Sequence, residues 1–131
     1  MKNLLCIAFF SVFLVGISSQ SAAQNEISRI AAAFKVGDSG ELGNFLANNV
    51  SIGVDKNEQS YSRAQASQVL KSFFDRHKPS DFTYRHSGNA EHKDSFYVGS
   101  LSTNQGSFRI TLFLVDTQDG KRIKRLRIEP K

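Results

Sequence analysis

Apolar residues recur with helical spacing in two short segments after residue 23. The first segment predicts a helix that ends where Gly37 can adopt a left-handed cap, and its buried stripe consists of Ile27, Ile30, Ala31 and Phe34. Asp38 followed by Glu41 is typical of a second helix start. The apolar spacing after Glu41 extends this helix to about Asn48 and Asn49.

A strand and a third helix follow in the pattern. Residues 50–54 alternate between apolar and polar, as a half-buried strand requires, and the polar residues 55–60 predict a turn. Ser62 and Gln65 form an S-x-x-Q capping box, which predicts that the third helix begins there. Pro79 predicts its end.

From residue 81 onward, apolar residues recur at every second position. Four strands are expected, at residues 82–86, 96–102, 108–115 and 122–128, with a turn at 87–89 after the first. The segments 104–106 and 119–120 are typical of hairpin turns. The order α-α-β-α-β-β-β-β, with helices gathered on one side of an antiparallel sheet, predicts an α+β fold.

The N-terminal segment has the order of a secretory signal. Lys2 precedes an apolar run from Leu4 to Ile17, and residues 18–23 are small and polar. The run is shorter than the roughly 20 residues that a membrane-spanning helix needs. We expect residues 1–23 to be cleaved and residues 24–131 to form a single domain, soluble in the periplasm or secreted. Cys6 lies in the apolar run and is the single cysteine, so the mature chain would form no disulfide.

Several short segments of the mature chain resemble the nuclear transport factor 2-like superfamily, a group of cystatin-like α+β cones. They are residues 61–62, 65–66, 73–74, 86–88, 98–99 and 123–129. The resemblance implies that the helices pack in the concave side of a strongly curved antiparallel sheet. More narrowly, the chain is similar to an uncharacterised family of small exported bacterial domains. The superfamily includes isomerase-like and dehydratase-like enzymes as well as binding and assembly modules.

His86 is the most reactive side chain placed on a predicted strand face. It would share that face with Tyr84, and with Tyr97 it forms our candidate pocket. A structural histidine is the simpler interpretation, because catalysis needs converging partners. Carboxylates such as Asp94 and Asp119 fall in predicted turns, where solvated charges are expected. The three histidines lack metal-ligand spacing, so no catalytic residue, metal or cofactor is predicted.

Basic residues are densest near the C-terminus. This candidate basic surface consists of Lys121, Arg122, Lys124, Arg125 and Arg127, in a chain of formal net charge +5. Such a surface could bind acidic envelope polymers or lipid head groups. It could instead be solvated and protect a strand from aggregation. Nucleic acid is disfavoured as a partner, because no aromatic residue interleaves with these charges.

Residues 108–115 are apolar on both strand faces at their end. If Phe108, Ile110, Leu112 and Leu114 point inward, Phe113 and Val115 point outward, which favours a homodimer through the outer sheet face. We expect a non-enzymatic, exported binding or interaction module, with a small hydrophobic molecule as one ligand class. The alternatives are a small-molecule enzyme of the isomerase or dehydratase type and a basic surface adaptor.

Overall fold

The computed structural model describes residues 21–90 and 94–131, with side chains from residue 24 onward. The predicted signal segment therefore lies outside the described residues, except for the backbone of residues 21–23. That backbone begins the first helix, so the predicted cleavage point before Gln24 falls in its first turn. No helix in the described residues is long and apolar enough to span a membrane.

Within the described residues, three helices form in the segments where the sequence predicts helices. They are α1 (Ser21–Val36), α2 (Ser39–Gly43) and α3 (Arg63–Arg76). Gly37 follows α1 with a φ of 70°, the left-handed conformation that glycine adopts at low cost. Asp38 caps α2 by accepting a hydrogen bond from the Glu41 amide at 2.9 Å. Ser62 and Gln65 form both bonds of the capping box at the start of α3.

In the part of the chain that the structure describes, six strands form one sheet in the order β2-β1-β6-β5-β4-β3. Their bounds are β1 (Leu46–Val54), β2 (Asn57–Ser62), β3 (Pro79–Asn89), β4 (Ser95–Thr103), β5 (Gly106–Thr117) and β6 (Gly120–Pro130). Neighbouring strands are antiparallel except β1 and β6, which run parallel. The parallel pair joins the β1–β2 hairpin to the meander that β3 to β6 form.

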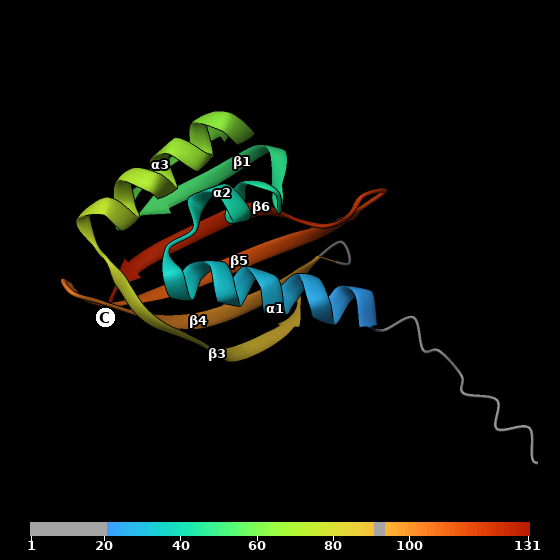
Figure 1. Cartoon of the computed structure of the whole chain (residues 1–131). Coiled ribbons are helices and arrows are strands. Elements are labelled where there is room, and N and C mark those ends of the chain that lie inside the picture. The colour runs from blue at the N-terminus through green and yellow to red at the C-terminus, as the bar shows by residue number, and fades with distance from the viewer. Residues whose placement is uncertain (1–20, 91–93) are drawn as a thin grey trace, which may run out of the picture.

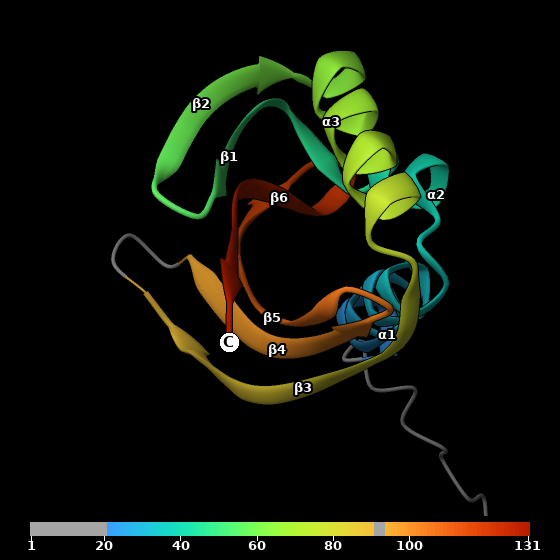
Figure 2. The same ribbon diagram turned by 90° about the vertical axis from the view of Figure 1, so that its left-hand side faces the viewer.

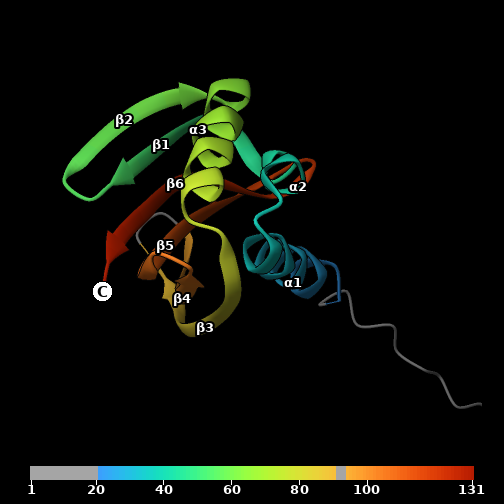
Figure 3. The same cartoon turned by 60° about the vertical axis from the view of Figure 1, so that its left-hand side comes forward.

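The sheet is strongly curved and does not close. Figure 1 shows α1 lying across the sheet and α3 lying beside β1. Figures 2 and 3 show the three helices together on one side, while the end strands β2 and β3 lie far apart. The predicted α+β class and the curved sheet with helices in its concave side are confirmed.

Aromatic rings fill the space between the helices and the sheet. Phe34 of α1 stacks on Phe82 of β3 with ring centroids 5.0 Å apart. Phe73 of α3 packs edge-on against Phe108 of β5 at 5.2 Å. The inward row that we expected on β5 is confirmed, because its members are all buried: Phe108, Ile110, Leu112 and Leu114.

The second helix ends earlier than predicted, at Gly43 instead of Asn48 or Asn49. Two glycines in five residues make a weak helix. Phe45 and Leu46 are nevertheless buried, the first in the turn after α2 and the second at the start of β1. Their apolar spacing thus reflects burial in the core and not continued helix.

The segment 55–60 was predicted as a turn and is mostly strand. The turn contains only Asp55 and Lys56, with Asp55 at a φ of 58°, and β2 begins at Asn57. β2 is an edge strand exposed along nearly all of its length, so it lacks the alternating pattern that would identify it.

The turn predicted at residues 87–89 is also wrong, since β3 continues to Asn89. Gly88 lies in the strand because the ring of Phe96 on β4 covers it, and a Cβ atom there would come within 2.7 Å of that ring. The glycine therefore marks a close approach between strands and not a chain reversal.

Candidate functional site

A depression of about 320 Å³ lies between the first turns of α1 and the adjoining parts of β3 and β4. Its lining contains all three residues of the predicted pocket, Tyr84, His86 and Tyr97, and no acidic side chain. The remaining lining residues are Gln24, Ile27, Arg85 and Ser87. We call this hollow the aromatic depression.

Tyr84 lines the aromatic depression and ties β3 to α1. Its hydroxyl donates a hydrogen bond to the Ile27 carbonyl at 2.9 Å. The ring packs against Phe82 at 5.0 Å and against Tyr97 at 5.5 Å. Burial, and to a smaller extent Tyr97, raises the pKa of Tyr84 well above its usual value. Tyr84 therefore stays neutral over the ordinary pH range, with its proton engaged by a backbone carbonyl.

His86 does not share a face with Tyr84, contrary to prediction. Tyr84 pairs with Gly99 and His86 pairs with Val98, so β3 contains one extra residue, Arg85, at this point. A β-bulge of this kind shifts the alternation of side chains. His86 consequently pairs with a residue of the outer face, and it borders the aromatic depression as an exposed side chain.

Gly99 of β4 pairs with Tyr84, directly before the extra residue in β3. At Gly99 the ring of Phe82 rests on the backbone, and a Cβ atom would come within 2.3 Å of that ring. The glycine makes room for the aromatic core, so the close approach involves a side chain.

The predicted basic surface is largely neutralised by acidic neighbours. Lys121 pairs with Asp116 at 2.8 Å, and Arg122 pairs with Glu26 of α1 at 3.2 Å. Lys124 contacts Asp94, and Arg127 contacts Glu129 at 3.1 Å.

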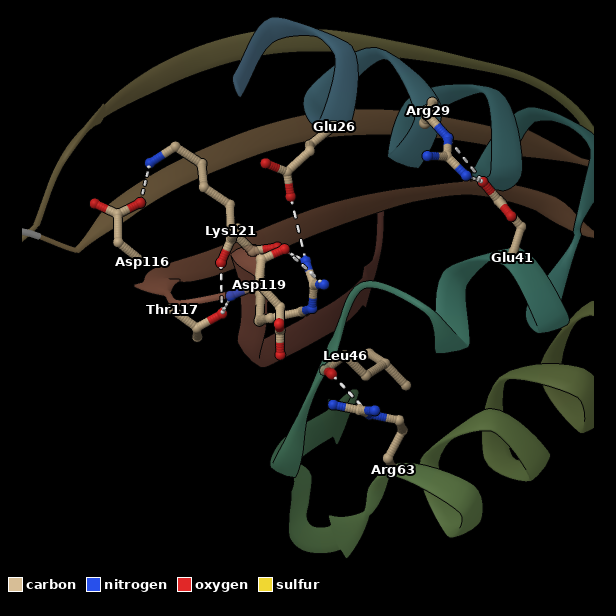
Figure 4. Close-up of polar contacts among 11 residues, drawn as sticks. Glu26, Arg29, Glu41, Leu46, Arg63, Asp116, Thr117, Asp119 and Lys121 are labelled. Atoms are coloured by element: carbon tan, nitrogen blue, oxygen red, sulfur yellow. Dashed lines mark hydrogen bonds and ion pairs between the residues drawn. The ribbon is translucent and has the colours of Figure 1, made fainter. Parts of the chain in front are cut away.

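Arg125 forms two hydrogen bonds to Glu58 of β2, at 2.6 and 2.9 Å. Figure 4 shows the Lys121–Asp116 pair beside Glu26. Each of the five cations thus has a carboxylate partner.

Asp94 is not the solvated turn residue that we predicted. It is buried directly before β4, and its carboxylate lies against the ammonium group of Lys124. Burial of a carboxylate requires such a partner. Within residues 21–90 and 94–131, no group of three or more histidine, cysteine or acidic side chains could hold a metal ion.

A second, more polar cleft of about 360 Å³ lies where β1 bows away from β6. Four residues of β1 separate Leu46 from Ser51, whereas one residue separates their partners on β6. Arg63 of α3 lines this cleft and donates hydrogen bonds to the Leu46 carbonyl and to the Asn48 side chain of β1, both at 3.0 Å. Figure 4 shows the Arg63 side chain directed at Leu46. The guanidinium group thereby holds the bowed strand.

Arg85, Ser87 and Gln24 complete the aromatic depression and were not identified from sequence. The bulge that exposes Arg85 there has no local signal, since it arises where β3 curves around α1. Gln24 comes from an element far from β3 in the sequence. The run Tyr84-Arg85-His86-Ser87 does hold four polar-tipped side chains, which was the available indication.

Comparison with known proteins places the chain in a family. Residues 27–129 match the model of DUF4783, a domain of unknown function. No curated protein matches the chain. A crystal structure of a DUF4783 family protein from Bacteroides fragilis is 33% identical with a TM-score of 0.75, and the alignment covers 79% of this chain and 96% of that one.

Two further structures extend the likeness. A DUF4783 family protein from Bacteroides ovatus is 29% identical with a TM-score of 0.75, covering 79% of this chain and 94% of that one. A nuclear transport factor 2-like protein of unknown function from Silicibacter pomeroyi is 13% identical with a TM-score of 0.62, covering 85% and 95%. This last likeness concerns the fold alone, and it agrees with the curved α+β fold that the sequence motifs suggested. The chain belongs to the DUF4783 family.

Proposed function

We propose that the protein is an exported, non-enzymatic binding module that holds a small ligand in the aromatic depression. Residues 1–23 would be removed on export, and residues 24–131 would form the mature domain. Two side-chain rings, those of Tyr84 and Tyr97, supply an apolar floor, and polar groups border it. This combination suits a ligand with one hydrophobic face, because binding sites pair apolar surface with a few placed polar groups.

The packed interior is the observation that carries this proposal. An enzyme on this fold would need an open cone with polar groups at its base. Here the concave side is occupied by buried phenylalanines, which include Phe34, Phe73, Phe74 and Phe82. The Tyr84 hydroxyl is committed to the Ile27 carbonyl, and His86 lies on the exposed rim. General acid–base chemistry needs such groups to converge on one point.

Xenon binding tests whether the interior is filled. Apolar cavities that are empty of water take up xenon, whereas a close-packed core does not. We expect no saturable xenon-induced shift of the methyl groups of Leu70, Leu101 and Leu112, which are buried in the core. A Phe34→Ala variant serves as the positive control, since it opens a cavity in the same place. Saturable uptake by the unaltered protein would show an unfilled interior and contradict the packed core on which the proposal depends.

We also propose that two copies pair through the outer face of the sheet. Phe96 and Phe113 are opposed on β4 and β5, and neither belongs to the core cluster. The Arg125 guanidinium lies over the Phe113 ring at 5.6 Å and is held by Glu58. The patch thus combines two aromatic rings with a cation and an anion at its border. A twofold contact needs such a self-complementary surface.

A further inference from the structure

We propose that the aromatic depression recognises a carboxylate attached to a ring, with Arg85 as the group that binds the carboxylate. This inference rests on the proposed function, because it names the ligand class of the same site. It follows from the bulge in β3, from the charges around the depression and from the two tyrosines.

The bulge is the first argument. Residues of a regular strand point alternately to its two faces. Around Arg85, however, four consecutive residues of β3 border the aromatic depression: Tyr84, Arg85, His86 and Ser87. The extra residue between the pairs Tyr84–Gly99 and His86–Val98 is Arg85 itself. Bulges often re-aim a side chain beside a binding site. The bulge thus brings Arg85 to the border of the aromatic depression, where a regular strand would turn it away.

The charge distribution is the second argument. The aromatic depression has two basic side chains at its border and no acidic one. Within the described residues, the side chains of Arg85 and His86 have no hydrogen-bond or ion-pair partner, whereas the five cations of β6 each contact a carboxylate. The guanidinium of Arg85 can therefore donate hydrogen bonds to both oxygens of a carboxylate, a geometry that arginine favours.

The two tyrosines are the third argument, because they indicate which group the ligand carries beside its carboxylate. The ring centroids of Tyr97 and Tyr84 are 5.5 Å apart with their planes tilted by 55°, so the two rings form an angled apolar wall that lines the depression together with Arg85 and His86. The Tyr84 hydroxyl is already bonded to α1, and its ring is therefore fixed in place. A flat or pyranose ring can lie against such a wall while its carboxylate reaches Arg85. The Ser87 hydroxyl and the Gln24 amide border the same space and can hydrogen-bond to ring substituents.

Paired probes test this assignment by isothermal titration calorimetry on protein purified from the exported fraction. Glucuronate is compared with glucose, and benzoate with benzyl alcohol, so that each pair differs in the carboxylate. We expect at least one carboxylate to bind at least about tenfold more tightly than its neutral partner, as one charge-assisted hydrogen-bonded pair implies. Arg85→Gln should remove that preference, and Tyr97→Ala should weaken both members of the pair.

Arg76→Gln is the matched control, because Arg76 is an exposed arginine at the end of α3 that does not border the aromatic depression. It should leave the preference unchanged, and the melting temperature of each variant shows that it is folded. Equal affinity for charged and neutral probes, both weakened by Tyr97→Ala, would overturn the carboxylate assignment and leave the proposed binding site standing. Failure of all four probes to bind would also overturn the assignment. The proposed site is then judged by the mapping described at the end of the Discussion.

Discussion

The hydroxyl of Tyr84 donates a hydrogen bond to the backbone carbonyl of Ile27 across 57 residues of sequence, at 2.9 Å. It joins the edge strand β3 to α1 beside the aromatic depression. We predict that Tyr84→Phe lowers the free energy of unfolding by about 0.5–1.5 kcal/mol, because the ring and its packing remain while one partly buried hydrogen bond is lost. Urea denaturation measures the change. An unaltered midpoint would show that this bond does not hold α1.

Tyr84 also makes the stability of the protein depend on pH. Burial raises the folded-state pKa of Tyr84 above the usual value of about 10. Above about pH 10 the unfolded chain therefore loses this proton while the folded chain keeps it, so stability falls as the pH rises further. Tyr84→Phe lacks this proton. Its unfolding free energy should decline less steeply between pH 10 and 11 than that of the unaltered protein, and equal slopes would contradict the assigned burial.

The capping box of α3 gives a test of local structure. The Ser62 hydroxyl accepts from the Gln65 amide at 3.2 Å, and the Gln65 side chain accepts from the Ser62 amide at 3.1 Å. Ser62→Ala should cost about 0.5–2 kcal/mol in unfolding free energy. In the double variant, Gln65→Ala should lower the unfolding free energy by less than it does alone, because both residues serve one motif. Ser60→Ala on the exposed β2 is the control, and full additivity in the double variant would count against the reciprocal motif.

We predict that any side chain at position 99 destabilises the fold. An alanine Cβ would lie 2.3 Å from the ring of Phe82, so Gly99→Ala should destabilise the fold by about 1–3 kcal/mol. Adding Phe82→Leu should recover part of the loss by vacating the space. Gly40→Ala in α2 is the matched control, since its Cβ would meet nothing closer than 3.4 Å. Thermal melts of the original protein and of these three variants measure the changes in stability. A Gly99→Ala protein as stable as the original would mean that Phe82 does not occupy this position.

The proposed dimer predicts a change of mass in solution. Phe113→Glu puts a carboxylate into the outer-face patch and should convert dimer to monomer, because a charge buried at a contact is costly. Arg125 lies beside this position and can pair with the new carboxylate, so the monomer should stay folded. Val36→Glu makes the same change at a 72% exposed residue of α1 and should leave the dimer intact. Light scattering after gel filtration provides the masses, and an unaltered protein that is monomeric at micromolar concentration would disprove the interface.

Export predicts a defined N-terminus. The small residues before Gln24 are those that signal peptidases accept, so the protein recovered from the envelope or the medium should begin at Gln24. Intact-mass spectrometry measures this directly. The cyclised form of an N-terminal glutamine, lighter by one ammonia, also counts as agreement. A protein that retains Met1, or one that carries a lipid, would contradict the assignment.

Elements with clear periodicity could be predicted, and elements shaped by tertiary contacts could not. The capping box located the start of α3 to the residue, and alternation located β4, β5 and β6 to within one or two residues. β2 was missed because an edge strand exposed on both faces has no alternation to detect. The pairing of Arg122 and Arg125 with acidic groups was equally hidden, since Glu26 and Glu58 come from α1 and β2.

The candidate site, too, was predicted only in part from the sequence. Tyr84, Tyr97 and His86 were predicted as one group, and all three border the aromatic depression. Their shared face was predicted wrongly for His86, because a single extra residue in β3 reverses the alternation after Arg85. Such a bulge depends on how the sheet curves around α1, which the local sequence does not encode.

Chemical-shift mapping with a fragment library tests the central claim of a peripheral binding site most directly, because it locates a site whatever the natural ligand is. The experiment uses isotope-labelled mature protein and records backbone amide shifts as small ring-containing fragments are added. We predict that the fragments that bind shift the amides of residues 24–27, 84–87 and 97, which border the aromatic depression. Shifts that centre on the buried Phe34, Phe73 and Phe82, or on β6 alone, would contradict the account.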